Sequence, residues 1–143
     1  MQIVADILKS KPDATVHTID PATMVFDAMQ LMTDRHIGAL VVTDGAEVVG
    51  IVTERDYAQK IALMNRASRD TPVRDIMTAQ VISVGPQDSA DHCMQLVTDS
   101  RIRHLPVLEG GQVIGVVSIG DLVKAVIEEQ RQELDHLQRY IAS

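Results

Sequence analysis

The sequence predicts a mixed α/β fold made of two copies of one unit, each in the order strand, helix, strand, strand, helix. Residues 16–61 align with residues 81–126 without a gap, in a register that takes Thr53 to Ser118. Chance rarely aligns apolar, turn and acidic positions together, so each copy is interpreted as a unit whose apolar face needs the other copy. A chain of 143 residues also suits one domain of about 100–200 residues, whereas half of it would bury little surface.

Composition narrows the classes of function. Apolar residues make up 45% of the chain but aromatic residues only 2%, so we expect an aliphatic core without the aromatic platforms on which bases stack. The net charge of −7 disfavours a nucleic-acid partner and an anionic membrane surface, since both need a cationic face. A local basic cluster could still hold a small phosphate.

The single cysteine, Cys93, rules out an internal disulfide and agrees with a reducing compartment. The first residues have no basic region leading into an apolar run, and there is no stretch of about 18 consecutive apolar residues. We therefore expect a cytoplasmic protein with no membrane partner.

Local patterns predict the first strand and the first helix of each copy. Residues 16–19 and residues 81–84 alternate like short strands. Apolar residues then recur at helical spacing, and Thr23 and Asp88 are the expected N-caps. The helices are expected to end near His36 and Arg101.

Each copy continues with two strands and a second helix. Residues 39–43 and 48–52 carry one hairpin signal, and residues 105–108 and 113–117 carry the other. Pro106 cannot donate to a ladder, so its strand should lie at an edge there, or that position should face elsewhere. The second helices are expected to begin at two good N-caps, Thr53 and Ser118.

The sequence around the repeats suggests the domain boundaries. Residues 73–77 echo residues 4–8, and the last helix continues into a tail with an apolar stripe of Leu134, Leu137 and Ile141. This stripe suits pairing with another helix, and packing on its own body is an equal alternative. The predicted division is a first repeat domain (1–64), a polar connector (65–72), a second repeat domain (73–127) and a C-terminal helical extension (128–143).

A duplicated motif is the strongest local signal for chemistry. In each copy a strand ends in a hydroxyl residue and an aspartate follows three positions later, Thr53 with Asp56 and Ser118 with Asp121. One interpretation is a capping box, in which the hydroxyl and the carboxylate each accept a backbone N–H group. The other is a ligand site, because an aspartate on the first turn of a helix can accept both hydroxyls of a ribose. The pattern alone leaves both open.

Basic residues form a second signal. Arg101, Arg103 and His104 stand at the entry to a strand, and Arg35 and His36 stand at the corresponding place in the first copy. Such a cluster can hold a phosphate bidentately. It can equally be a solvated loop with weak salt bridges.

Enzymatic interpretations have little support. The histidines form no zinc-ligand pattern with Cys93, and His92 and Cys93 are expected on a helix face and in the core. The sequence carries no Gly-rich phosphate loop and no nucleophile with a positioned base. We expect no catalytic residue and no metal site.

These residues together resemble a known family. Two copies of this unit, each closed by Gly-x-x-Thr/Ser-x-x-Asp, with Arg-His-Leu-Pro at residues 103–106, look like a tandem pair of cystathionine-β-synthase (CBS) domains, or Bateman module. The resemblance spans about residues 3–127. It is closest to small free-standing bacterial members, through the segments Ile37-Gly38-Ala39-Leu40, Thr53-Glu54-Arg55-Asp56-Tyr57 and Ser118-Ile119-Gly120-Asp121.

The resemblance implies a pseudo-two-fold body with two clefts between its halves, which in many members hold adenine nucleotides. Ser118 and Asp121 would then bind ribose in one cleft, and Thr53 and Asp56 in the other. Adenine would contact the opposite copy, through Thr15, Val16, Val41 and Val42 in the Asp121 cleft and through Ala79, Val81, Pro106 and Val107 in the Asp56 cleft.

The two clefts are expected to differ in how they treat phosphate. Arg103 and His104 resemble the phosphate-binding pair of the family, whereas the first copy has Gly38-Ala39 at that place. Compensation by Arg35 and His36 is not assured by the sequence, which therefore leaves open whether both clefts are occupied.

The implied function is that of a non-catalytic regulatory module. It would bind an adenosine-containing ligand such as AMP, ATP, NAD(H) or S-adenosylmethionine and act in trans on an effector protein that the sequence does not identify. Modules of this family commonly pair, so we expect a homodimer with the tail as a clasp. The alternative is a ligand-independent oligomeric adaptor in which both motifs are only helix caps, and the charge disfavours a nucleic-acid-binding role.

Overall fold

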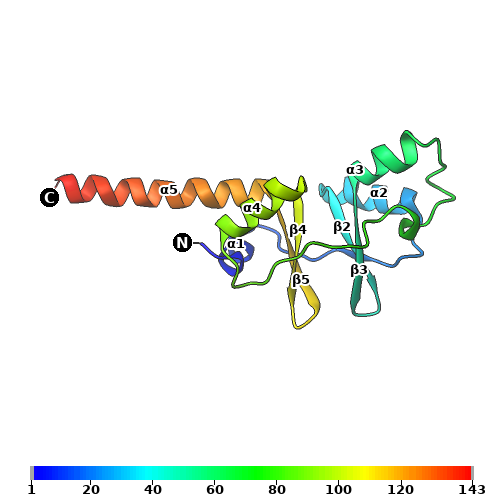
Figure 1. Cartoon of the computed structure of the whole chain (residues 1–143), viewed down its shortest axis with the longest axis horizontal. Coiled ribbons are helices and arrows are strands. Elements are labelled where there is room, and N and C mark those ends of the chain that lie inside the picture. Colours follow the sequence, from blue (N-terminus) through cyan, green and yellow to red (C-terminus); the bar gives the residue numbers. More distant parts are fainter. Residues whose placement is uncertain (1, 143) are drawn as a thin grey trace. The chain divides into compact units, whose positions relative to one another are not determined.

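The structure is a computed structural model that describes residues 2–142. Its elements follow the predicted order of helices and strands except at residues 81–84, where no strand forms (Figure 1). The helices and strands are α1 (Val4–Ser10), β1 (Thr18–Ile19), α2 (Val25–Arg35), β2 (Ala39–Asp44), β3 (Glu47–Thr53), α3 (Glu54–Tyr57), α4 (Ala90–Ser100), β4 (His104–Glu109), β5 (Gln112–Ser118) and α5 (Ile119–Ala142). A π-helical turn, Ala58–Ala62, follows α3, and a 3-10 turn, Val73–Asp75, lies before the second repeat.

The chain forms two compact units that do not follow the sequence repeats. The first-repeat unit comprises Val16–Ile82 with Gly110–Gln112, and the second-repeat unit comprises the residues up to Thr15, Ser83–Glu109 and the chain from Val113 onward. Each repeat is therefore completed by the segment that precedes the other repeat. The boundaries of the sequence repeats stay a prediction.

In the first-repeat unit, β2 and β3 form an antiparallel hairpin and β1 adds to β2 in parallel, with Thr18 opposite Val41. Gly45 provides the positive φ of +63° that the tight turn of this hairpin requires. The sheet and α2 pack around a cluster of buried, mostly aliphatic side chains, and removing this apolar surface from water stabilises the unit. Its buried members are Val25, Ala28, Met32, Leu40, Val42, Val52, Ile61, Val73 and Ile76.

The segment after the connector seals this core. Thr78 forms an isolated antiparallel bridge with Ile51, with N···O distances of 3.0 and 2.9 Å. The side chain of Met77 lies over Gly50, and a Cβ atom at Gly50 would stand 2.5 Å from the Met77 sulfur. A side chain at position 50 would therefore have to displace the Met77 side chain, and its Cβ atom would stand 3.1 Å from the Thr78 carbonyl oxygen.

The core of the second-repeat unit is covered in the same way, and here α1 takes the place that residues 73–78 have in the first-repeat unit. Val4 N–H donates to the carbonyl of Asp88 at 2.9 Å, and the side chains of Val4 and Ile7 are buried in the core. Leu8 lies over Gly115, where a Cβ atom would stand 2.7 Å from a Leu8 methyl carbon. The echo between residues 4–8 and 73–77 thus corresponds to two equivalent packing roles.

The expected strand at residues 81–84 is wrong, because only Val84 pairs with the sheet, in a parallel bridge with Val107. Val84 N–H donates to Pro106 and its carbonyl accepts from Leu108, at 3.0 and 2.8 Å. One pair further back, the donor to Ile82 would have to be the N–H group of position 106, which proline lacks. The ladder stops there, whereas the first repeat has Val41 at this position and forms β1.

Both predicted N-caps of the first helices are also wrong. Ser89 caps α4 by accepting from His92 N–H at 3.0 Å, while the Asp88 carboxylate accepts from Gly85 N–H at 2.7 Å. Met24, not Thr23, is the N-cap residue of α2, and no side chain caps that helix. Instead, carbonyl groups of the connector accept the first N–H groups of α2: Val25 N–H donates to Thr71 at 2.8 Å and Phe26 N–H to Ser68 at 3.0 Å. The predicted ends of α2 and α4 at His36 and Arg101 are confirmed, since both adopt the left-handed conformation.

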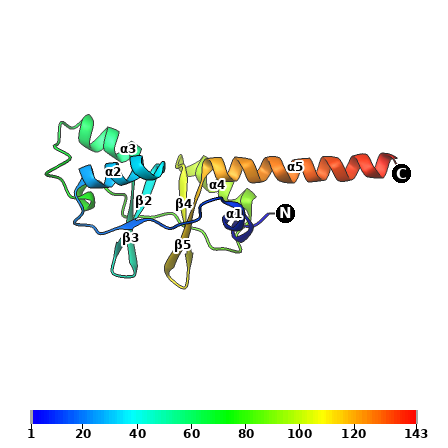
Figure 2. The ribbon, with the colours of Figure 1, turned by 180° about the vertical axis from the view of Figure 1, so that it is seen from behind.

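The predicted long last helix is confirmed. α5 runs as one helix well past the other elements of its unit (Figures 1 and 2). Leu134, Leu137 and Ile141 are 56%, 53% and 74% exposed, so the alternative in which the tail packs on its own body is wrong. Among residues 2–142, no helix has both the length and the apolar character needed to span a membrane.

Candidate ligand-binding sites

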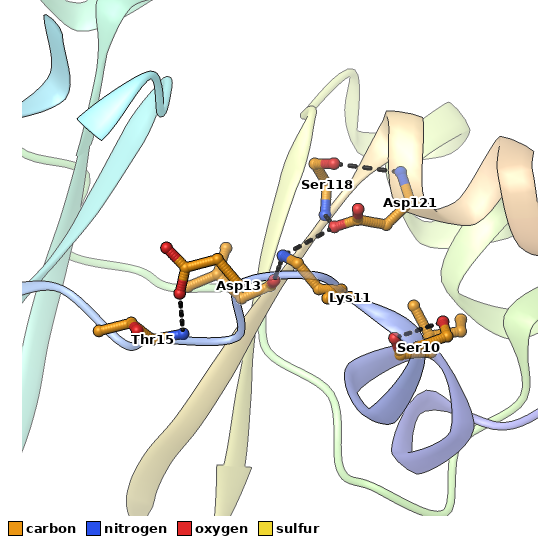
Figure 3. A network of polar contacts seen from close by, with 8 residues as sticks. Ser10, Lys11, Asp13, Thr15, Ser118 and Asp121 are labelled. Carbon is orange, nitrogen blue, oxygen red and sulfur yellow. Dashed lines mark hydrogen bonds and ion pairs between the residues drawn. The ribbon is translucent and has the colours of Figure 1, made fainter. Parts of the chain in front are cut away.

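The second-repeat motif lies at the junction of β5 and α5. The Ser118 hydroxyl accepts from Asp121 N–H at 3.1 Å, and Oδ2 of Asp121 accepts from Ser118 N–H at 2.9 Å (Figure 3). These reciprocal contacts are a capping box. The capping interpretation is thus confirmed as local geometry, and it leaves open what else the carboxylate binds.

Lys11, which sequence reasoning missed, contacts the same carboxylate. Its Nζ lies 3.0 Å from Oδ2 of Asp121 and donates to the carbonyl of Val116 at 2.9 Å (Figure 3). Lys11 directly follows α1, so the docking of α1 on the second-repeat unit positions it. No local signal marks this pair, because the two residues lie at opposite ends of the sequence.

The surroundings keep Asp121 ionised. Burial alone would raise the pKa of its carboxyl, but hydrogen bonds from Ser118 and from Lys11, together with the positive charge of Lys11, lower the pKa below its usual value. Oδ1 of Asp121 has no hydrogen-bond partner within residues 2–142. An ionised carboxylate with one available oxygen is a suitable acceptor for ligand hydroxyls.

The first-repeat motif is also a capping box, at the junction of β3 and α3. Oδ2 of Asp56 accepts from the N–H and the hydroxyl of Thr53, at 3.0 and 3.2 Å, and Thr53 Oγ1 accepts from Asp56 N–H at 3.2 Å. Lys60 donates to Oδ1 of Asp56 at 3.0 Å and to the carbonyl of Ile76 at 2.8 Å. Each motif aspartate therefore faces one lysine.

The backbone joins each motif to the start of a neighbouring strand. Ile119 N–H donates to the carbonyl of Arg103 at 2.8 Å, and in the first repeat Glu54 N–H donates to Gly38 at 3.2 Å. Arg103 is exposed and stands beside the Ser118 and Asp121 motif, while the first repeat presents a glycine there. This difference makes the second-repeat motif the better candidate for a phosphate-bearing ligand.

The residues expected to contact adenine belong to both units. Val41 and Val42 are fully buried in β2, and Val107 is fully buried in β4. The second-repeat unit holds Thr15, Arg103, His104, Pro106 and Val107 together with Ser118 and Asp121, and the first-repeat unit holds Val16, Val41, Val42, Ala79 and Val81 together with Thr53 and Asp56. Which of these residues contact a ligand stays a prediction.

A cavity of about 470 Å³ within the first-repeat unit was not expected. Its walls come from α2, from the residues between α2 and β2, and from α3, and they include Met29, His36 and Tyr57. It contains none of the predicted ligand-binding residues.

Cys93 has a structural role, as expected. Its side chain is fully buried in the core of the second-repeat unit, and burial, with a smaller contribution from the charge of Asp88, raises the pKa of the thiol to about 11. The neighbouring His92 is exposed on the surface of α4. The prediction of one core residue and one helix-face residue is confirmed.

The family model described as CBS domain matches residues 4–63 and 73–128. The CBS domain-containing protein CBSX3, mitochondrial, of Arabidopsis thaliana is 44% identical over 146 residues, which cover 96% of this chain and 71% of the relative.

Solved structures of CBS-domain proteins are also similar to this chain. A protein with CBS domains from Burkholderia ambifaria MC40-6 is 54% identical, with a TM-score of 0.86 and coverage of 90% of this chain and 96% of that one. The CBS domain pair of protein MJ0100, solved with 5′-methylthioadenosine and S-adenosyl-L-methionine, is 26% identical, with a TM-score of 0.75 and coverage of 90% and 98%. With two matched repeats and relatives of this similarity over nearly its whole length, the chain belongs to the CBS-domain family.

Proposed function

We propose that this chain is a non-catalytic regulatory module that binds an adenosine-containing ligand and passes its binding state to a partner protein in trans. The observation that carries the proposal is the carboxylate of Asp121. It is held ionised by Ser118 and Lys11, and one oxygen has no hydrogen-bond partner within residues 2–142. A ribose diol needs such an acceptor.

The neighbouring residues fit the rest of a nucleotide. Arg103 is joined through its backbone to the first turn of α5 at 2.8 Å and carries an exposed guanidinium. A guanidinium next to a ribose acceptor suits the phosphate of AMP, ATP or NAD(H). The CBS pair of MJ0100, with two adenosine derivatives bound, supports the adenosine class of ligand.

Regulation would follow from linkage. A ligand that binds one arrangement of the module more tightly favours that arrangement, and a partner that prefers it experiences the same coupling, typically about 1–3 kcal/mol. We further propose that the module acts in the cytoplasm, a location that its single, unpaired cysteine supports.

The adaptor without a ligand is the second candidate. It is favoured by the two capping boxes, since each motif aspartate already accepts from its own hydroxyl residue and from a lysine. In that case both motifs serve only the stability of the helices.

A ligand-dependent rise in melting temperature tests the proposal. AMP at 100 times its dissociation constant should raise the free energy of unfolding by about 2.7 kcal/mol. For a chain of this size, this corresponds to a rise of several degrees in the melting temperature. Arg103→Ala should reduce the shift with AMP much more than the shift with adenosine. Equal reductions for both ligands would show that Arg103 does not bind the phosphate. The absence of any shift with AMP, ATP, NADH or S-adenosylmethionine would favour the adaptor.

We also propose that two copies of the chain pair through α5. The exposed stripe of Leu134, Leu137 and Ile141 has the spacing of a coiled-coil seam. A second copy of the same helix would bury this stripe, which would stabilise the pair by about 25 cal/mol per Å² of apolar area buried.

A further inference from the structure

Asp56 is more completely enclosed than Asp121. Lys60 binds Oδ1 of Asp56, and Thr53 binds Oδ2 through both its N–H and its hydroxyl. The Asp56 side chain is 10% exposed. Both of its carboxylate oxygens are therefore taken by groups of the chain itself.

The carboxylate of Asp121 is arranged differently. Oδ2 accepts from both Ser118 N–H and Lys11 Nζ, so two donors share one oxygen (Figure 3). Oδ1 accepts from no group within residues 2–142, and the side chain is 23% exposed. In the first repeat both carboxylate oxygens of the aspartate therefore accept hydrogen bonds from the chain, whereas in the second repeat only one of them does within residues 2–142.

The two lysines do not occupy equivalent positions of the sequence repeat. The register of the repeat takes Lys60 to Ala125, and the echo of residues 4–8 in 73–77 takes Lys11 to Gln80. Each lysine is therefore particular to its own repeat. Lys60 is one helical turn from Asp56, and its second contact, the Ile76 carbonyl, holds the ammonium group in place.

We propose that Lys60 is a latch that closes the Asp56 motif to adenosine-containing ligands, so that the wild-type chain binds ligand at the Asp121 motif alone. This inference rests on the proposed function. A ribose diol at Asp56 must displace an ammonium group held by two oxygens, whereas at Asp121 it meets an available oxygen. Removing the ammonium group should therefore open a second site.

Calorimetric titration with AMP measures the number of sites. The wild-type chain should bind one AMP per chain, and Asp121→Asn should weaken this binding at least about tenfold. Lys60→Met, which keeps the aliphatic length of the side chain, should bind two AMP per chain. The double variant Lys60→Met with Asp56→Asn should return to one.

Matched controls separate the latch from a general loss of charge. Lys60→Arg keeps the cation and should still bind one AMP, and Lys9→Met removes an exposed lysine near Lys11 and should also bind one. If Lys60→Met unfolds, Lys60→Gln is titrated in its place. Two equal sites in the wild type, or one site in both Lys60→Met and Lys60→Gln, would overturn the latch while leaving the proposed function intact. No binding of AMP, ATP, NADH or S-adenosylmethionine to any variant would overturn both.

Discussion

In the first-repeat unit the cation beside the motif aspartate comes from the π-helical turn that directly follows α3, and in the second-repeat unit it comes from the residue that directly follows α1. Lys60 follows Asp56 by one turn, whereas Lys11 reaches Asp121 only because α1 docks there. The completing segments, residues 73–77 and residues 4–8, show the same contrast between near and distant parts of the chain. Equivalent electrostatic and packing roles are thus filled by local contacts in one repeat and by long-range contacts in the other.

The largest expected effect tests whether the completing segments are equivalent. Ile7 and Ile76 occupy matching positions and are 2% and 1% exposed. Ile7→Ala and Ile76→Ala should each lower the free energy of unfolding by about 2–4 kcal/mol, because each leaves a cavity in a closed core. Urea unfolding measures both, and a cost below about 1 kcal/mol for either one would break the equivalence.

The second prediction sharpens the contrast between the two carboxylates. Asp121→Asn should weaken AMP binding at least about tenfold, since a charge-assisted hydrogen bond contributes about 1.5–3 kcal/mol. Asp56→Asn should leave the affinity of the wild-type site unchanged. Titration calorimetry compares the two variants, and equal losses would show that the repeats use their carboxylates alike.

The third prediction concerns pH. The pKa of Asp121 is lowered in the folded chain, so its ionised form contributes stability that is fully present above the ordinary aspartate pKa of 3.8 and is lost as the pH falls through the lowered value. Lys11→Met should raise the pKa of Asp121 and reduce the loss of stability below about pH 4. Acid unfolding followed by circular dichroism checks this, with Lys9→Met as the matched control. An unchanged acid transition in Lys11→Met would mean that Lys11 does not stabilise the carboxylate.

The smallest effect on folding is expected at the tail. Residues 131–142 are exposed, so truncation after Glu128 should change the free energy of unfolding of the single module by less than about 0.5 kcal/mol. The same truncation should weaken the proposed dimer at micromolar concentration. Light scattering should give twice the chain mass of 15.7 kDa for the full chain, and a truncated chain that stays fully dimeric would assign the interface to other helices.

Local patterns predicted most of the fold. The hairpins, the ends of α2 and α4 and the capping boxes at Thr53 and Ser118 all follow from neighbouring residues. Two of the wrong predictions, the N-cap at Thr23 and the strand at residues 81–84, came from competition with distant groups. Connector carbonyls accept the first N–H groups of α2, and the missing N–H of Pro106 ends a ladder with residues far along the chain.

The lysine contacts of the two motifs show the same contrast, because one is local in the sequence and the other is not. The pair of Asp56 and Lys60 has a helical spacing that a closer reading of the sequence could have identified. The pair of Asp121 and Lys11 could not be found, because the Lys11 anchor at Val116 is 105 positions away. Such a contact depends on where α1 docks, which no local pattern determines.

The exchange of completing segments also sets an order for folding during synthesis. Nearly all of the first-repeat unit lies in the continuous stretch Val16–Ile82, so it can fold once that stretch has left the ribosome. The second-repeat unit needs residues from both sides of that stretch, and Val4 and Ile7 stay uncovered until β4, β5 and the first turns of α5 have been made. Domains generally fold from the N-terminus as they emerge, but α1 emerges before the first-repeat unit and reaches its place in the core only after that unit is complete.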